Sequence, residues 1–190
     1  MATAAGAVQC WCLQDNGVLG NGLVTGHACA PVVATMPVGF GAAVDVEAGV
    51  ASACARNALG AAACWGRNTS GGLGNGNTID QSTAVTVMGG LAFAQLAVGS
   101  GTTCGRTTGG RIYCWGLGLG GQLGNGMNVN FSTPQAVGVA TNWTDLAAGA
   151  SHTCALNSLG EVYCWGANDQ GQLGLGSMSS RNVPTLVTAI

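Results

Sequence analysis

Residues 151–176 read SHTCALNSLGEVYCWGANDQGQLGLG, and variants of this stretch recur along the chain. The triplet Cys-Trp-Gly occurs three times at a spacing of 50 residues, beginning at Cys64, Cys114 and Cys164. An earlier Cys10-Trp11 pair has Cys12 in place of the glycine. Self-similarity at a fixed period of this size is typical of solenoids, propellers and arrays. The repeats therefore decide the fold.

A glycine-rich signature follows each Cys-Trp pair. Its four copies are GVLGNG at 17–22, GGLGNG at 71–76, GQLGNG at 121–126 and GQLGLG at 171–176. These copies lack the Lys-Ser/Thr ending of a phosphate-binding loop, and a single ligand site would not require four of them. The pattern indicates a feature of each repeat rather than a nucleotide site.

Another cysteine precedes each Cys-Trp-Gly triplet by ten residues. The pairs are Cys54 and Cys64, Cys104 and Cys114, and Cys154 and Cys164, with Gly60, Gly110 or Gly160 between them. A glycine just past the centre of the loop suits a three-residue turn with a bulge, so the spacing predicts a β-hairpin. Opposed strand positions have Cα atoms about 4.5–5.5 Å apart, which a disulfide can span. We predict cross-strand disulfides Cys54–Cys64, Cys104–Cys114 and Cys154–Cys164.

The tryptophan beside each second cysteine belongs to a periodic set. This set consists of Trp11, Trp65, Trp115 and Trp165. Because side chains alternate along a strand, each tryptophan should point away from the neighbouring cysteine. We expect all four in the core, each wedged against the adjoining unit, with a disulfide on the opposite face.

These motifs resemble the regulator of chromosome condensation repeat. The similarity rests on Cys-Trp-Gly followed by Gly-Gln-Leu-Gly-x-Gly and preceded by Ser-His-Thr-Cys-Ala-Leu. It is strongest over residues 151–176 and covers nearly the whole chain, with weaker agreement before residue 40. The resemblance implies an all-β propeller, usually of seven blades, each a four-stranded antiparallel sheet. The paired cysteines are more similar to exported bacterial members than to cytosolic or nuclear eukaryotic ones.

The chain is expected to be one repeat domain, 1–190, with fewer units than a complete propeller. We divide it into units 1–43, 44–93, 94–143 and 144–190. The first unit should lack the strands before its Cys-Trp strand. The last should be truncated, because Val183–Ile190 resembles the segment leading into a next unit. Seven blades at this spacing would need roughly 350 residues.

Three arrangements stay open for such an incomplete array. The chain is a fragment of a longer propeller, or other copies complete its sheets in a ring or fibre, or it closes alone as a four-bladed ring. An open array leaves unpaired strand edges, which favour association. Charged residues make up only 6% of the chain, so little repulsion would keep copies apart.

Composition excludes several classes of partner. Glycine accounts for 34 of 190 residues and apolar residues for 47%, which indicates short buried strands and tight turns rather than disorder. The formal net charge is −2 and no basic stripe is present, so nucleic acid is not an expected partner. No apolar run reaches the ~18 residues of a membrane span. Met1–Gln9 lacks the pattern of a secretory signal.

Nine cysteines fit an oxidising compartment, which favours an extracellular or cell-surface location, with the periplasm as a further option. The odd count leaves at least one thiol free or bonded between chains. The preferred pairing is Cys12–Cys29, with Cys10 left over. A weaker alternative is a zinc site made of Cys10, Cys12, His27 and Cys29, because cysteine and histidine suit zinc. Its Cys-x-Cys and His-x-Cys spacing is unusual for a structural zinc site.

No catalytic residue and no cofactor are predicted. No serine or cysteine has a nearby histidine and acid arranged as a nucleophilic set. His152 is one of two histidines, and we interpret it as a hydrogen-bonded structural residue rather than a base.

The sequence favours a non-catalytic structural and interaction protein. Its partners would be copies of itself, the rest of a longer propeller, or another protein. A second hypothesis is a secreted inhibitor module, whose exposed loop aromatics would have to come from Phe40, Phe131 and Trp143. A guanine nucleotide-exchange factor like the family's nuclear founder fits less well, because disulfides do not suit the nucleus and the chain has half the needed length.

Overall fold

The computed structural model describes the backbone of residues 1, 3–13, 15–24 and 27–188, and their side chains except at 12, 13 and 27–30. Within this part of the chain there are fourteen β-strands and no helix. All strand pairs in the sheets are antiparallel. The predicted all-β class is confirmed.

Three four-stranded sheets follow one another along the chain. The first contains β3 (Ala43–Ala48), β4 (Ser52–Asn57), β5 (Ala62–Gly66) and β6 (Gln81–Thr86). The second contains β7 (Phe93–Val98), β8 (Thr102–Thr107), β9 (Ile112–Gly116) and β10 (Phe131–Ala136). The third contains β11 (Trp143–Ala148), β12 (His152–Asn157), β13 (Val162–Gly166) and β14 (Arg181–Leu186). Strand order in each sheet follows the chain, as in a propeller blade.

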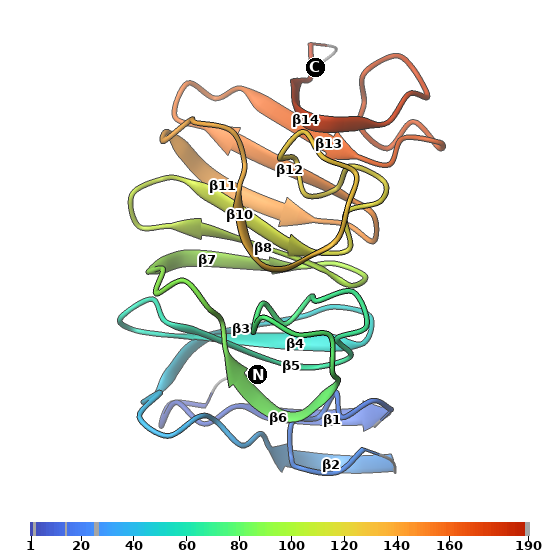
Figure 1. Cartoon of the computed structure of the whole chain (residues 1–190). Helices are drawn as coiled ribbons and strands as arrows, with labels where there is room; N and C mark the ends of the chain where they lie inside the picture. The colour runs from blue at the N-terminus through green and yellow to red at the C-terminus, as the bar shows by residue number, and fades with distance from the viewer. Residues whose placement is uncertain (2, 14, 25–26, 189–190) are drawn as a thin grey trace.

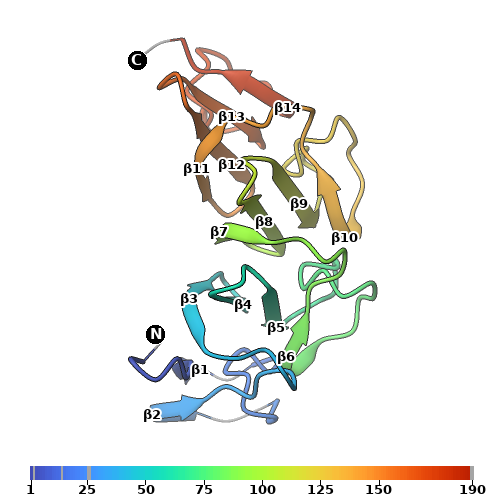
Figure 2. The ribbon, with the colours of Figure 1, turned by 90° about the vertical axis from the view of Figure 1, so that its left-hand side faces the viewer.

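The sheets form an open stack. A two-stranded sheet of β1 (Gln9–Leu13) and β2 (His27–Val33) lies at one end, and the β11–β14 sheet lies at the other (Figures 1 and 2). The two end sheets are far apart in both views, so the stack is not closed into a ring. The incomplete propeller predicted from the repeats is confirmed.

The predicted hairpins are present with the predicted register. Cys54 lies opposite Cys64, and the pairs Cys104 with Cys114 and Cys154 with Cys164 are placed in the same way. In the first hairpin the Gly60 amide donates to the Asn57 carbonyl and the Asn57 amide to the Ala61 carbonyl, both at 3.0 Å. Gly60 has a φ of 84°, so a residue that tolerates the left-handed region is needed there.

The two-stranded β1–β2 sheet corresponds to the outer half of a blade. In β1–β2 the register shifts between Cys10, opposite Val32, and Cys12, opposite Ala28. The same shift occurs at the same place in β5–β6, between Cys64 and Gly66. Strands β1 and β2 are therefore the third and fourth strands of their unit, as expected.

The expected truncation of the last unit, 144–190, is wrong. Arg181–Leu186 pairs with β13 as the fourth strand of its own sheet instead of leading into a next unit. Pro184 fits this position, because a residue without an N–H is tolerated in an edge strand. The first strands β3, β7 and β11 begin one residue before the proposed boundaries at 44, 94 and 144.

Candidate functional site

The contact between adjoining blades is the most regular chemical feature of the molecule. Between the β3–β6 and β7–β10 sheets, one buried cluster contains Cys54, Cys64, Leu73, Phe93 and Trp115. The rings of Phe93 and Trp115 lie 5.7 Å apart, and the Trp115 side chain is fully buried. The cysteine pair of one blade thus packs in the same cluster as the tryptophan of the next.

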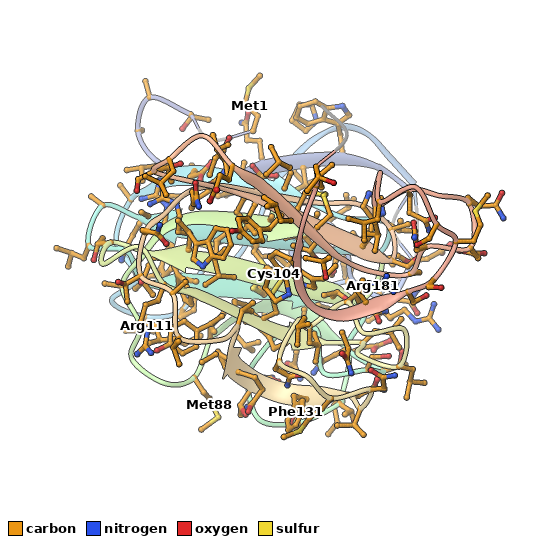
Figure 3. All side chains as sticks on the ribbon, turned by 90° about the horizontal axis from the view of Figure 1, so that it is seen from above. Met1, Met88, Cys104, Arg111, Phe131 and Arg181 are labelled. Carbon is orange, nitrogen blue, oxygen red and sulfur yellow. A yellow bond between two sulfur atoms is a disulfide. The ribbon has the colours of Figure 1, made fainter. Side chains whose placement is uncertain are left out.

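The following contact repeats this composition. The cluster between the β7–β10 and β11–β14 sheets contains Cys104, Cys114, Leu123, Trp143 and Trp165. Here Trp143 takes the place of Phe93, with its ring centroid 6.5 Å from that of Trp165. Seen along the stack, Cys104 lies near the middle of the blades (Figure 3). Cysteine pairs and tryptophans therefore occupy opposite faces of their sheets.

Each buried tryptophan also makes a hydrogen bond to the glycine-rich turn of the preceding unit. The Nε1 atoms of Trp65, Trp115 and Trp165 donate to the carbonyl oxygens of Val18, Gly72 and Gln122, at 2.8, 2.9 and 3.0 Å. Thr103 Oγ1 and Thr153 Oγ1 donate to the second and third of these oxygens. In each of these three turns, the carbonyl two residues before the glycine that follows the leucine thus accepts an indole N–H.

The glycine after the leucine of each turn lies directly beneath the indole ring. A Cβ atom at Gly20, Gly74 or Gly124 would lie 2.8, 2.7 or 2.6 Å from the corresponding Nε1. Each of these glycines also has a positive φ, of 65–70°. The turn was predicted as a feature of each repeat, but its hydrogen bond to the tryptophan of the next unit was not predicted. The sequence signal for this contact was that each of these turns is followed by a Cys-Trp pair in the next unit.

The structure places three cysteine pairs at disulfide distance. The Cα–Cα distances are 4.0 Å for Cys54–Cys64 and 4.1 Å for both Cys104–Cys114 and Cys154–Cys164. The first two pairs are fully buried between blades. Cys154 is half-buried, because no further sheet of the described chain covers that face of the last blade.

Cys10 stands where Cys64 stands in the complete blade, and it is a free thiol among the described side chains. It is half-buried beside the cluster around Trp65, and this burial raises the pKa of its thiol. With Trp11, Val46 and Ala53 it lines an apolar cavity of about 400 Å³. The Cys12–Cys29 disulfide and the zinc alternative with His27 concern side chains outside those that the structure describes.

Trp11 does not lie in the core, contrary to the prediction. Its side chain is 43% exposed, whereas Trp65, Trp115 and Trp165 are fully buried. Burial of each tryptophan depends on the glycine-rich turn of a preceding unit, and the described chain has no such turn before β1. Its Nε1 finds no acceptor among the described residues.

Two buried asparagines shape the long loops and were missed from the sequence. Asn68 Oδ1 accepts a hydrogen bond from the Leu73 amide at 3.0 Å, and its Nδ2 donates to the Ile79 carbonyl at 3.1 Å. Asn168 makes the same contact with the Leu173 amide at 2.9 Å. Both asparagines stand three residues after a repeat tryptophan, which was a usable signal. They position the turn that receives the indole.

The acidic and histidine side chains take part in structural contacts. Gln95 Nε2 donates to Asp145 Oδ1 at 2.7 Å, which links the β7–β10 and β11–β14 sheets. This hydrogen bond, with one from the Leu146 amide, holds the pKa of Asp145 below its ordinary value. The ring of His152 lies against Gly149 and has no hydrogen-bond partner among the described residues, so the interpretation as a hydrogen-bonded residue was wrong.

The aromatic side chains considered for exposed loops are mainly in the interior. Phe40 is 7% and Trp143 is 6% exposed, and Phe131 is half-buried. Trp143 is buried because it packs edge-on against Tyr163, with ring centroids 5.3 Å apart. Phe131 lies at the margin of the stack in Figure 3. Of the three candidate aromatic anchors for an inhibitor module, Phe40 and Trp143 are therefore not exposed to a partner.

Sequence profiles of the Regulator of chromosome condensation (RCC1) repeat match residues 93–122, 143–172, 109–156 and 160–190. Together these matches span residues 93–190, which is more than half of the chain. The chain belongs to the regulator of chromosome condensation repeat family. No curated protein sequence matches it.

Several solved structures share the fold. Human WBSCR16 superposes with a TM-score of 0.88 at 23% identity, over 98% of this chain and 49% of the other. Yeast RCC1 (Prp20), in a structure with bound Kap60, gives 0.81 at 21% identity, over 96% and 45%. A second structure of Prp20p from Saccharomyces cerevisiae, described with its binding to Gsp1p and histones, gives 0.76 at 18%, over 95% and 46%.

The chain spans about half the length of these three structures. At these identities the likeness concerns the fold alone. No helix capable of crossing a membrane occurs in the described residues.

Proposed function

We propose that this chain is a non-catalytic structural and interaction module of a disulfide-stapled propeller that works in an oxidising compartment. The observation that carries the proposal is the burial of three cysteine pairs in successive blades, two of them wholly enclosed between sheets. The extracellular space or cell surface suits it best, with the periplasm as an equivalent environment.

The position of the cysteines supports a structural use of their oxidation. Each pair joins the second and third strands of a blade, and the first two pairs lie where the next blade packs. Closing a short loop in this way typically adds about 2–4 kcal/mol to stability. Staples of this kind suit a protein with few charges and many exposed turns that must persist outside the cell.

Protein binding is the activity that the fold supports best. Prp20, which shares the fold, has been described bound to Kap60 and as binding Gsp1p and histones. For this chain we propose protein partners of a different kind, because its charged residues are too few to match a basic or acidic partner. The candidates are copies of the same chain or the rest of a longer propeller, because the described sheets form an open stack (Figures 1 and 2).

The two other hypotheses are less well supported. An inhibitor module would need exposed aromatic anchors, and Phe40 and Trp143 are buried. A nucleotide-exchange factor would act in the nucleus, where cysteine pairs do not persist as disulfides.

The oxidation state of the native protein tests the proposal. The protein is taken from its source without reductant, unfolded with a thiol-alkylating reagent present throughout, and digested for peptide mass mapping. We expect three linked peptide pairs that join Cys54 to Cys64, Cys104 to Cys114 and Cys154 to Cys164. Recovery of these six cysteines in alkylated form would overturn the assignment to an oxidising compartment.

A further inference from the structure

A cavity of about 440 Å³ lies beside the junction of the second and third four-stranded sheets. Its walls come from residues 137–142, which connect β10 to β11, and from the complete β11–β14 sheet. Cavities that bind small molecules have volumes of about 300–1,000 Å³. This one is therefore large enough for a small ligand, and it is formed wholly by complete units of the stack.

Two aromatic rings form a corner of the cavity. The ring centroids of Trp143 and Tyr163 are 5.3 Å apart, and the rings stand at 86° to each other. Both residues line the cavity, Trp143 with its few exposed atoms and Tyr163 as a half-buried wall. The face of an aromatic ring is negative and attracts a cation within about 6 Å of the ring centroid. Two perpendicular rings therefore make a corner that suits a cation.

A single carboxylate supplies the charge of the site. Glu161 is the one charged residue among the described residues that line the cavity. Its Oε2 atom accepts hydrogen bonds from Asn157 Nδ2 at 2.7 Å and from the Tyr163 hydroxyl at 3.2 Å, which hold the carboxylate beside the ring. Its Oε1 atom has no hydrogen-bond partner among the described residues. The negative charge is therefore left for a bound cation.

The indole at position 143 is unfavourable for the fold. Trp143 is 6% exposed, and its Nε1 atom is buried without a hydrogen-bond partner among the described residues. A buried donor without a partner lowers stability. Phe93 begins the equivalent strand of the second sheet and packs against Trp115 as Trp143 packs against Trp165, but it has no polar atom to leave unpaired. Cation binding accounts for the tryptophan better than packing does, because tryptophan is the best aromatic partner of a cation.

The neighbouring units have different side chains at these positions. In the second sheet Arg111 and Tyr113 stand where Glu161 and Tyr163 stand in the third, and the first sheet has alanine at both positions. A role common to every repeat would use the same residues in each. The carboxylate beside the ring therefore indicates a ligand that belongs to this junction.

We propose that this cavity binds a small organic cation, a methylated ammonium ion on a short aliphatic chain. Val139 and Leu159, which are 86% and 76% exposed, border the cavity and would cover the aliphatic part. A primary ammonium has three N–H donors, and one available carboxylate oxygen cannot pair with all of them. Methyl groups replace these donors and pack against the rings and the apolar walls, so the methylated ion fits the site better.

Binding of choline to the full chain tests the proposal, with isothermal titration calorimetry as the measurement. Ethanolamine, which is the primary ammonium analogue, and the neutral alcohol in which carbon replaces the choline nitrogen serve as comparisons. We expect choline to bind about tenfold or more tightly than the neutral alcohol, since the two share a shape and differ in charge. Ethanolamine should bind more weakly than choline.

Three variants assign the binding to the cavity. Glu161→Gln removes the charge and Tyr163→Leu removes one ring, and each should weaken choline binding by about tenfold. Trp143→Phe introduces the residue that stands at Phe93, and it should weaken binding by about threefold. Glu47→Gln is the matched control, because it changes the net charge by the same amount at an exposed site in the first sheet.

Nuclear magnetic resonance of the indole N–H groups locates the ligand. The signal that disappears in Trp143→Phe should be the one that choline shifts most in wild type. Thermal melts show whether each variant is folded. Glu161→Gln keeps the size of its side chain, so it tests the site even if a ring substitution unfolds the protein.

Four results would overturn the proposal. The absence of choline binding would exclude the site, and equal binding of choline and the neutral alcohol would show that charge is not recognised. Tighter binding of ethanolamine would assign the cavity to a primary ammonium instead. Binding that Glu161→Gln leaves unchanged would place the ligand elsewhere. None of these results alters the cysteine map, so the oxidised module is judged separately.

Discussion

The indole nitrogen of Trp115 lies 2.9 Å from the carbonyl oxygen of Gly72, a residue 43 positions earlier in the chain and in the preceding blade. Thr103 Oγ1 donates to the same oxygen at 2.8 Å. A buried polar group left without a partner costs about 1–3 kcal/mol. The indole acceptor therefore gives each blade junction a polar requirement in addition to its apolar packing, and at the Trp115 and Trp165 junctions a threonine shares it.

Replacing Trp115 by phenylalanine should lower the free energy of unfolding by about 1–3 kcal/mol, because the indole donor is lost while much of the ring packing stays. The same change at Trp11 should alter it by less than about 0.5 kcal/mol, since that side chain is exposed. Urea unfolding followed by circular dichroism, at a concentration where the chain is monomeric, compares the two. Equal losses at both positions would contradict this account of the junction.

Replacing Gly124 by alanine should destabilise the protein more than replacing Gly138. Both have a positive φ, of 65° and 59°, so both substitutions carry the left-handed penalty of about 1–2 kcal/mol. A Cβ at Gly124 also meets Trp165, whereas one at Gly138 meets nothing within 4 Å. The additional loss at Gly124 should be about 1–3 kcal/mol. Equal melting temperatures for Gly124→Ala and Gly138→Ala would show that the Trp165 indole moves aside for the added methyl group with no loss of stability.

Reductant added to the folded protein should open Cys154–Cys164 before the other two pairs. Cys154 is half-buried at the end of the stack, whereas Cys54, Cys64, Cys104 and Cys114 are fully buried. Timed alkylation and peptide mapping after addition of a small thiol would follow the order. Simultaneous loss of all three pairs would indicate that reduction requires global unfolding.

The link between Gln95 and Asp145 should make the junction of the last two blades sensitive to acid. The pKa of Asp145 is lowered in the folded state, so its contribution is present above the ordinary value of 3.8 and is lost as the pH falls below it. Asp145→Asn should therefore reduce stability near neutral pH and flatten the fall in stability at pH values below the ordinary carboxyl pKa. Thermal melts of both proteins over this range provide the measurement. If the melting temperatures of wild type and Asp145→Asn fell in parallel as the pH was lowered, Asp145 would not contribute to the acid sensitivity.

Local spacing was sufficient to predict the hairpins. Two cysteines ten residues apart with Gly60, Gly110 or Gly160 between them leave one register in which they oppose each other, and the structure has that register. The burial of Trp65, Trp115 and Trp165 followed from their period. These features depend on contacts that recur within each complete unit, so the repeated sequence motif is enough to predict them.

Features that depend on the neighbouring unit were not predictable in the same way. Trp11 has the same backbone position as Trp65, but no glycine-rich turn covers it among the described residues, and its own motif does not indicate this difference. Val183–Ile190 was interpreted as leading into a next unit, whereas pairing with β13 makes Arg181–Leu186 the outer strand of its own sheet. The burial of Trp143 had a weak signal, since Phe93 stands 50 residues earlier at the start of the equivalent strand.

Every indole receptor in the stack is made by residues that precede its tryptophan. Val18 comes before Trp65, as Gly72 does before Trp115 and Gln122 before Trp165. A ribosome adding about 5–20 residues per second completes each receptor roughly 2–9 s before the matching indole is synthesised. The nascent chain can therefore grow blade upon blade, with each finished sheet serving as the template for the next. At any moment of synthesis, the apolar surface awaiting cover is that of a single blade.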